Sequence, residues 1–223
     1  MDSIAVTQLN EPRIRYAPFR RGRRRHITFE EALQLPAVDS TVGTNAGNVL
    51  DPTLRKSRRR PCIVEFRDDP PTQFLEALVP VDRRRYIMWP TAFDLITYQA
   101  GGFFAEHRDH RHSKKHYATL LIFPPAVGAY AHTGGTLIIK HDDDTMNPFV
   151  FESSANQVWT FIAFHTHLRH ECLPVSWGQR VVFKTELELS CNPTWDPDAH
   201  VPRDPSPALL DVRPYHNEIV DRN

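Results

Sequence analysis

Apolar residues gather in short runs over the second half of the chain. From residue 86 onward, eight such runs are separated by Gly, Pro, Asn and Asp, which is the pattern of short β-strands joined by turns. The runs read YIMW, FDLITYQ, ATLLIF, GGTLIIK, PFVFES, VWTFIAF, RHECLPV and QRVVFKTELEL. So many strands in so short a segment predict a mainly β fold whose core is an antiparallel double sheet, a jelly roll or double-stranded β-helix.

The first part of the chain predicts helices that flank this sheet. Thr28 precedes Glu31 by three residues at the start of an apolar segment, which is the spacing of a capping box. The segment PPTQFLEALVP at 70–80 predicts a second helix that begins after prolines. Together with the β core over residues 86–190, these helices predict one domain over residues 26–190.

Charge is unevenly distributed although it balances overall. Lys+Arg 27 equals Asp+Glu 27, yet residues 1–60 carry twelve basic against six acidic side chains. We expect residues 1–25 to form an irregular basic arm and residues 191–223 a Pro-rich acidic tail. The arginine clusters at 20–26, 55–60 and 83–85 are consistent with a phosphate-binding or acidic-partner surface, with a nuclear import signal, or with a solvated arm.

Three unevenly spaced cysteines without a CxxC pair argue against a disulfide framework and against a thiolate zinc site. The N-terminus lacks an apolar leader, and no apolar run reaches the roughly 18 residues of a membrane span. We therefore expect an intracellular protein, cytoplasmic or nuclear, without a membrane partner. The sequence does not predict its oligomeric state.

The stretch FFAEHRDHRHSKKHY at 103–117 holds a candidate metal site. On a β-strand, side chains two positions apart share a face, so His107 and Asp109 can converge on one point. They would supply two thirds of a 2-His-1-carboxylate triad, the ligand set typical of Fe(II) oxygenases. His165, His167 and His170 all follow the run VWTFIAF, and each is a candidate for the third ligand.

Beyond single motifs, the spacing of these residues resembles the prolyl 4-hydroxylase-like branch of the Fe(II)/2-oxoglutarate oxygenases over roughly residues 30–190. That family places Tyr, Gly and then His-x-Asp at fixed intervals, and later a His followed by Pro-Val, Gly and a basic residue. The matching positions are Tyr98, Gly101, His107 and Asp109, then His170, Pro174, Val175, Gly178 and Arg180. The family's Gly-Gly-x-Leu and Arg-x-Ser elements match Gly134, Gly135 and Leu137, and Arg55 and Ser57.

The resemblance implies a role for each site residue. His107, Asp109 and His170 would hold Fe(II), and Arg180 would bind the far carboxylate of 2-oxoglutarate. Tyr98 would hydrogen-bond the same co-substrate. At the position where some family members use a tyrosine for it, this chain has Phe123, so we expect Thr119 on the same strand to take that role.

The implied activity is that of a dioxygenase using Fe(II), 2-oxoglutarate and O2, with ascorbate as an optional reductant. It would hydroxylate a prolyl or other amino-acid-like group of a peptide, protein or small molecule, and would release succinate and CO2. One alternative is an oxygenase acting on nucleic acid. Such enzymes carry a second arginine six residues after the first, where this chain has Glu186, which speaks against it. Another alternative is a non-catalytic jelly-roll module that keeps a metal for stability.

Overall fold

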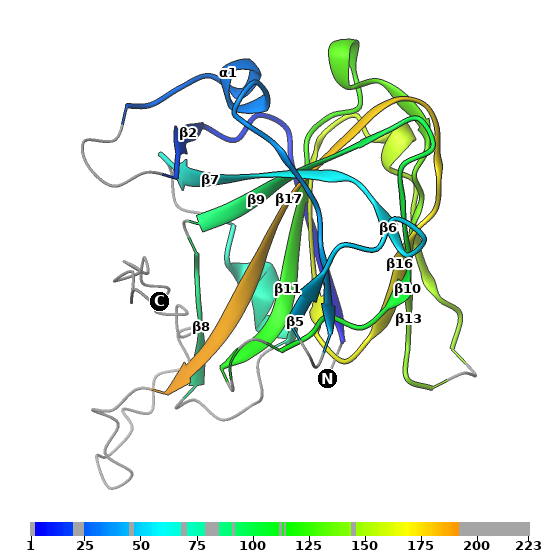
Figure 1. Cartoon of the computed structure of the whole chain (residues 1–223). Helices are drawn as coiled ribbons and strands as arrows, with labels where there is room; N and C mark the ends of the chain where they lie inside the picture. Colours follow the sequence, from blue (N-terminus) through cyan, green and yellow to red (C-terminus); the bar gives the residue numbers. More distant parts are fainter. Residues whose placement is uncertain are drawn as a thin grey trace, which may run out of the picture.

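The chain folds into two facing antiparallel sheets (Figure 1). The computed structural model describes residues 3–19, 25–44, 47–67, 71–78, 85–90, 92–111, 113, 115–143 and 146–191. Within these ranges, almost all regular structure is β-strand. No helix in these ranges is long and apolar enough to cross a membrane.

The larger sheet has the strand order β1-β15-β11-β17-β9-β7-β2. Three short strands extend it, since β8 and β12 pair with β17 and β3 pairs with β7. The bounds are β1 (Ile4–Leu9), β2 (Ile14–Pro18), β3 (Val38–Asp39), β7 (Arg58–Phe66), β8 (Arg85–Met88), β9 (Ala92–Gln99), β11 (His116–Phe123), β12 (His132–Gly134), β15 (Trp159–His165) and β17 (Val175–Cys191).

The smaller sheet has the order β14-β13-β16-β10-β6, and a separate hairpin joins β4 to β5. The chain passes from one sheet to the other and back, because β9, β11, β15 and β17 lie in the larger sheet while β10, β13 and β16 lie in the smaller one. This alternation confirms the predicted double-stranded β-helix. The bounds are β4 (Val42–Thr44), β5 (Gly47–Val49), β6 (Arg55–Lys56), β10 (Phe103–His107), β13 (Leu137–Lys140), β14 (Phe149–Phe151) and β16 (Arg169–Cys172).

Both faces of the larger sheet are buried. On β15, Phe161 belongs to an apolar cluster beneath the helices, whereas its neighbour Ile162 belongs to a second cluster between the sheets. A strand that is covered on both faces reads as a continuous apolar run, without the alternation of a half-exposed strand. Each of the eight predicted runs contributes to a strand, so that prediction is confirmed.

One helix closes the outer cluster. Helix α1 (Phe29–Leu33) begins with the predicted capping box, in which Thr28 and Glu31 each accept a hydrogen bond from the other's backbone N–H. Its Phe29 ring packs against Phe183, with ring centroids 5.5 Å apart. The second predicted helix is a 3₁₀-helix instead, and the described residues contain two further 3₁₀ turns. The bounds are η1 (Gln73–Leu78), η2 (Gly128–Tyr130) and η3 (Ser153–Ala155).

The expectation of an irregular arm over residues 1–25 is wrong for its described part. Strand β1 pairs with β15 and strand β2 pairs with β7, so both belong to the larger sheet. Both strands contain apolar residues, but each lies far along the chain from its partner, and pairing with that partner stabilises them where local pattern does not. The cluster at residues 20–24 lies outside the described residues, as do residues 83 and 84 and the predicted tail after residue 191.

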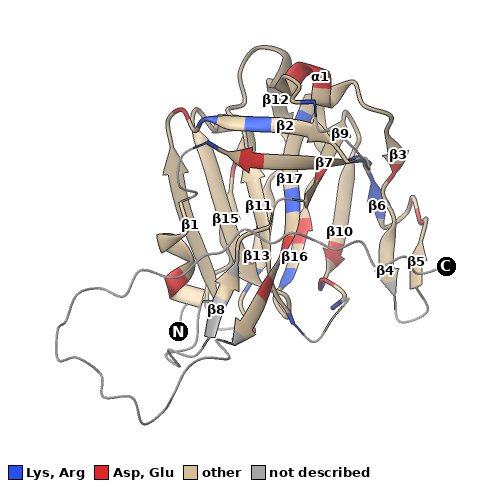
Figure 2. Cartoon of the chain, turned by 90° about the vertical axis from the view of Figure 1, so that its left-hand side faces the viewer, with Lys and Arg blue, Asp and Glu red and all other residues tan. Residues whose placement is uncertain are grey.

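The middle arginine cluster, at residues 55–60, is part of the folded domain. It spans β6 and β7, and Arg55 is only 9% exposed. Basic and acidic residues are mixed along the strands of the larger sheet rather than gathered on one face (Figure 2). The expectation of a solvated arm therefore fails for this cluster.

The aromatic contacts of Phe183 predict its contribution to stability. Phe183 is 1% exposed and also stacks on Tyr16, with ring centroids 5.6 Å apart. We expect Phe183→Ala to lower the free energy of unfolding by about 3–5 kcal/mol, because it leaves a cavity among the rings. Trp177→Ala on the same strand is the control. Trp177 is 64% exposed, so a comparable loss for this variant in urea unfolding would contradict the prediction.

Candidate metal centre

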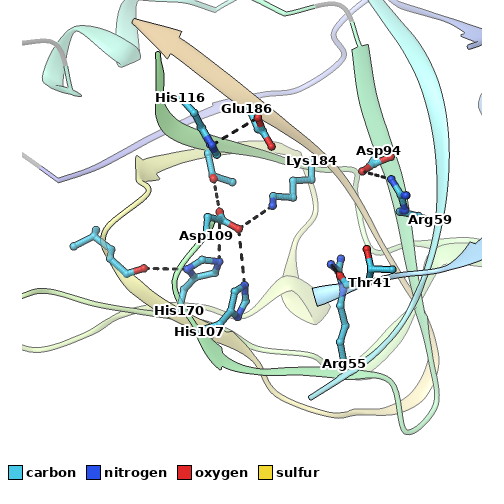
Figure 3. A network of polar contacts seen from close by, with 12 residues as sticks. Thr41, Arg55, Arg59, Asp94, His107, Asp109, His116, His170, Lys184 and Glu186 are labelled. Atoms are coloured by element: carbon cyan, nitrogen blue, oxygen red, sulfur yellow. Dashed lines mark hydrogen bonds and ion pairs between the residues drawn. The ribbon is translucent and has the colours of Figure 1, made fainter. Parts of the chain in front are cut away.

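Two histidines face each other across adjacent strands at one end of the smaller sheet. Strand β10 pairs antiparallel with β16, and the register sets His107 directly opposite His170. Their ring centroids lie 4.2 Å apart (Figure 3). The expected strand placement holds for His107 but not for Asp109, which follows the end of β10.

The carboxylate of Asp109 lies between the two imidazoles. Its Oδ1 is 3.9 Å from His107 Nε2, and its Oδ2 is 3.8 Å from His170 Nε2. Two ligands bound to one ion at roughly 2.1 Å lie no more than about 4.2 Å apart, so each His–Asp pair can share an ion. All three ligand atoms fall within 4.8 Å of one another.

Backbone carbonyls fix the orientation of both rings. His107 Nδ1 lies 2.8 Å from Ala105 O, and His170 Nδ1 lies 3.1 Å from Leu168 O. A carbonyl oxygen can only accept, so each Nδ1 carries the proton and donates it. Each Nε2 therefore presents its lone pair toward Asp109, as a metal-binding histidine requires.

Burial and charge set the protonation states of the site. Burial lowers the pKa of His107 to about 3, with the nearby His170 adding to the effect. Burial also lowers the pKa of His170. For Asp109, burial opposes ionisation, but the Lys184 ammonium and the two imidazoles outweigh it and hold the carboxyl pKa below its usual range. Two neutral imidazoles and one carboxylate form the donor set that a divalent cation needs.

Two side chains hold Asp109 in place. Lys184 on β17 donates to Oδ1 over 2.9 Å, and the Thr119 hydroxyl on β11 donates to Oδ2. Thr119 was predicted to bind the co-substrate, whereas its hydroxyl contacts the Asp109 carboxylate. Lys184 was not among the predicted site residues. Strand alternation places it on the same face as Arg180 and Val182, but its contact with Asp109 depends on how β17 lies beside the end of β10.

A stack of three groups supports His107. Its ring lies on that of Phe104, with centroids 3.5 Å apart, and the Arg55 guanidinium carbon lies 4.3 Å from the centre of the Phe104 ring. Arg55 in turn donates to Ser57 Oγ and to Thr41 O. The Arg-x-Ser element therefore positions a ring stack beside the candidate ligand.

Arg180 lies deep in the same cavity. It is 2% exposed, its Nε donates to Ser153 Oγ over 3.1 Å, and its guanidinium carbon lies about 5 Å from the ring centres of Tyr98 and Phe123. Within the described ranges, no carboxylate pairs with this guanidinium. A Cβ on Gly135 would come within 2.7 Å of Arg180 Cδ, so only glycine leaves room for the arginine there. The buried cation is placed to receive an anion from outside the chain.

One cavity of about 420 Å³ connects the triad with Arg180. Its walls come from both sheets and include Tyr98, Phe104, Thr119, Leu121, Leu137, Cys172, Val182 and Lys184. The predicted site residues thus line a single space.

The two competing histidines lie elsewhere. His165 follows Phe164, which faces the His170 ring, and alternation along β15 turns His165 to the opposite face. There it packs edge-on against Tyr117, with ring centroids 4.6 Å apart. His167 Nε2 lies 3.2 Å from a carboxylate oxygen of Asp142.

No protein-family model matches the chain, and no curated protein matches it. Several solved structures are similar to it, and three of them are as follows. An oxidoreductase of the 2OG-Fe(II) oxygenase family from Burkholderia pseudomallei has 15% sequence identity and a TM-score of 0.43, over 70% of this chain and 75% of that one. A prolyl-4-hydroxylase from Pseudomonas putida has 16% identity and a TM-score of 0.40, over 61% and 73%.

The third is a prolyl hydroxylase from Trichoplax adhaerens in complex with a hypoxia inducible factor oxygen degradation domain peptide fragment. It has 14% identity and a TM-score of 0.48, over 68% of this chain and 70% of that one. All three TM-scores lie below 0.5. The chemistry of the site therefore rests on its own residues.

The separation of the histidines predicts their effects on metal binding. We expect His170→Ala to lower Mn(II) affinity by more than the roughly 10–100-fold typical of groups that only support a ligand, because it removes a donor atom. His165→Ala should remain close to wild type, since His165 packs on Tyr117. Titration of both metal-free variants with Mn(II) measures this. Weak binding by His165→Ala together with tight binding by His170→Ala would refute the assignment.

The lowered pKa of His107 predicts acid sensitivity of the metal-free protein. Unfolded His107 takes up a proton below pH 6.5, whereas the folded site resists it down to about pH 3. The unfolded state therefore binds more protons across this window, and stability falls as the pH drops. We expect about 2 kcal/mol from His107 alone between pH 7 and pH 5. In urea unfolding with chelator present, His107→Gln should lose correspondingly less. An equal loss in both proteins would contradict the prediction.

Proposed function

We propose that the chain is an Fe(II)- and 2-oxoglutarate-dependent dioxygenase similar to prolyl 4-hydroxylases. The observation that carries this proposal is the union, in one cavity, of a His-Asp-His ligand set and a buried arginine without a carboxylate partner in the described part of the chain. A metal-binding module kept for stability would need the triad alone. Burying a guanidinium beside it is costly and would bring such a module no gain.

Each residue then has a chemical task. His107, Asp109 and His170 would hold the iron on one face, which leaves coordination positions for the co-substrate and O2. Bound iron supplies O2 activation. Arg180 would bind the far carboxylate of 2-oxoglutarate, and the faces of Tyr98 and Phe123 would hold the guanidinium in position by cation–π contact.

The remaining residues orient the ligands and shield the cavity. Lys184 and Thr119 keep the Asp109 carboxylate fixed during turnover, and Phe104 holds the His107 ring. In the balanced reaction, a substrate C–H, 2-oxoglutarate and O2 become a C–OH, succinate and CO2. The group hydroxylated would be a prolyl or another amino-acid-like group, with ascorbate as an optional reductant.

Succinate formation tests the proposal directly. Purified protein with Fe(II), 2-oxoglutarate, ascorbate and O2 should convert 2-oxoglutarate to succinate, and chelation of the metal should stop the conversion. His165→Ala should keep measurable turnover and Asp109→Ala should have none. A wild-type protein that binds Mn(II) but forms no succinate would favour the non-catalytic metal-binding module.

No carboxylate among the described residues pairs with Arg180, so removing this arginine should weaken binding of 2-oxoglutarate. Removing Arg180 would leave the far carboxylate of 2-oxoglutarate buried without its partner, a loss of roughly 3–5 kcal/mol for a broken buried pair. Arg180→Leu should therefore raise the 2-oxoglutarate concentration needed for half-maximal turnover by about two to three orders of magnitude. Arg180→Lys keeps the charge but loses the two-pronged geometry, and it should lose less. Equal losses would show that charge is not what matters at this position.

A further inference from the structure

The mouth of the cavity differs in chemistry from its floor. Along the inward face of β17, exposure rises from Arg180, which is 2% exposed, to the Lys184 side chain, which is 24% exposed. The strand register places Val182 beside Ile96 and Lys184 beside Asp94. The walls around Val182, deeper in the cavity, are therefore apolar. The walls around Lys184, at the depth of the candidate metal ligands, are charged.

A second cavity region of about 650 Å³ opens at this charged level, and His107 and Asp109 belong to its walls. We call it the mouth; its other walls include Asn48, Arg59, Asp94, Arg108 and Lys184. Across the larger sheet, the charges alternate in sign from Arg59 on β7 to Asp94 on β9 and Lys184 on β17. Arg59 and Asp94 lie on the wall across from the triad in Figure 3.

The contact between Arg59 and Asp94 is loose. Arg59 Nη1 lies 3.4 Å from Asp94 Oδ2, and the two side chains are 36% and 32% exposed. In the described ranges, Arg59 Nε has no acceptor although solvent does not reach it. Exposed pairs of this kind contribute only about 0–1 kcal/mol, and an unsatisfied buried donor costs about 1–3 kcal/mol. Stability of the fold does not account for this pair.

We propose that Arg59 and Asp94 bind the α-carboxylate and the α-ammonium group of a free amino acid. The carboxylate and the ammonium of a free amino acid are attached to the same carbon. Their separation is therefore short enough for one to reach Arg59 while the other reaches Asp94. The carboxylate of the amino acid accepts from the terminal nitrogens of Arg59, which in the described ranges contact only Asp94 and at 3.4 Å, and its ammonium donates to Asp94. The amino-acid side chain then extends within the same mouth toward His107 and Asp109.

Charge favours this ligand over a residue inside a peptide. A peptide residue presents neutral amide groups, and it would cover Arg59 and Asp94 without a charge for either of them. The zwitterion adds one charge of each sign, so Arg59 and Asp94 each face an opposite charge on the ligand. This inference rests on the proposed function, since it names the substrate class of that same site.

Binding measured without turnover tests the inference. Wild-type protein loaded with Mn(II) and 2-oxoglutarate under argon is titrated with each of the free L-amino acids by calorimetry. Every ligand that binds is compared with its N-acetyl form, its carboxamide and a tripeptide that holds it in the middle. We expect at least one free amino acid to bind, and each blocked form to bind at least about 10–100-fold more weakly.

Variants locate the site on the wall. Arg59→Gln and Asp94→Asn keep the side-chain shape and should each weaken binding of the free amino acid about 10–100-fold. Arg58→Gln is the matched control, because Arg58 is exposed and faces Asp39 on the other side of the strand. It should bind as the wild type does. Thermal unfolding of each variant shows that the fold is kept.

Three results would overturn the inference: no free amino acid binds, the centred tripeptide binds as tightly as the free form, or both wall variants bind like wild type. A failure of the proposed function looks different. It is an absence of succinate formation by the Fe(II)-loaded wild type, whereas the binding experiment needs neither O2 nor turnover. A protein that forms succinate with peptides but does not bind free amino acids would support the proposed function and contradict this inference.

Discussion

The register of β17 is the constraint on which both the core and the site depend. Successive residues of this strand face opposite sides of the larger sheet, and both sides are buried. Phe183 faces the aromatic cluster under α1, while Val182 and Lys184 on either side of it face the cavity. A slip of one residue would turn the phenylalanine into the cavity and the lysine into an apolar cluster. The pairing of β17 therefore determines both the stability of the core and the geometry of the site, and a change in its register would alter both.

Asp109 shows how the fold tolerates a buried carboxylate at the centre of the site. Its side chain is 6% exposed, and burial alone would favour the protonated form. The Lys184 ammonium reverses this preference and Thr119 adds a hydrogen bond to the other oxygen. A carboxylate offers about four lone-pair directions, so two accepted hydrogen bonds leave each oxygen able to reach a cation. The same two donors that make the buried charge tolerable also fix the direction in which it can bind.

The local order of apolar and polar residues was sufficient to predict the strands whose apolar residues are consecutive in the sequence. The runs of the larger sheet became strands because both of its faces need apolar side chains, and those of the smaller sheet did so because they supply the cluster between the sheets. Thr28 formed its capping box because that contact spans only three residues. Strands β1 and β2 escaped prediction, since their partners β15 and β7 are far along the chain. At the site, spacing chose His170 over His165, and the alternation along β15 gives the physical reason. The role of Thr119 and the presence of Lys184 depend on how β11 and β17 lie beside the end of β10, which no local pattern encodes.

Hydrogen-bond satisfaction separates the cations around the cavity by role. Arg55 donates to Ser57 and Thr41 and stacks on Phe104, so its donors are used within the fold and it supports a ligand ring. Lys184 is paired with Asp109 and positions that carboxylate. Among the described residues, Arg180 donates to Ser153 through Nε, and the rings of Tyr98 and Phe123 rather than a carboxylate lie beside its guanidinium carbon. A cluster of arginines in the sequence does not distinguish one arginine from another. In the folded chain, only an arginine with unsatisfied donors can gain hydrogen bonds by binding an anion. In this fold Arg180 at the cavity floor and Arg59 at its mouth fit that description, one at each end of the path that passes the candidate ligands.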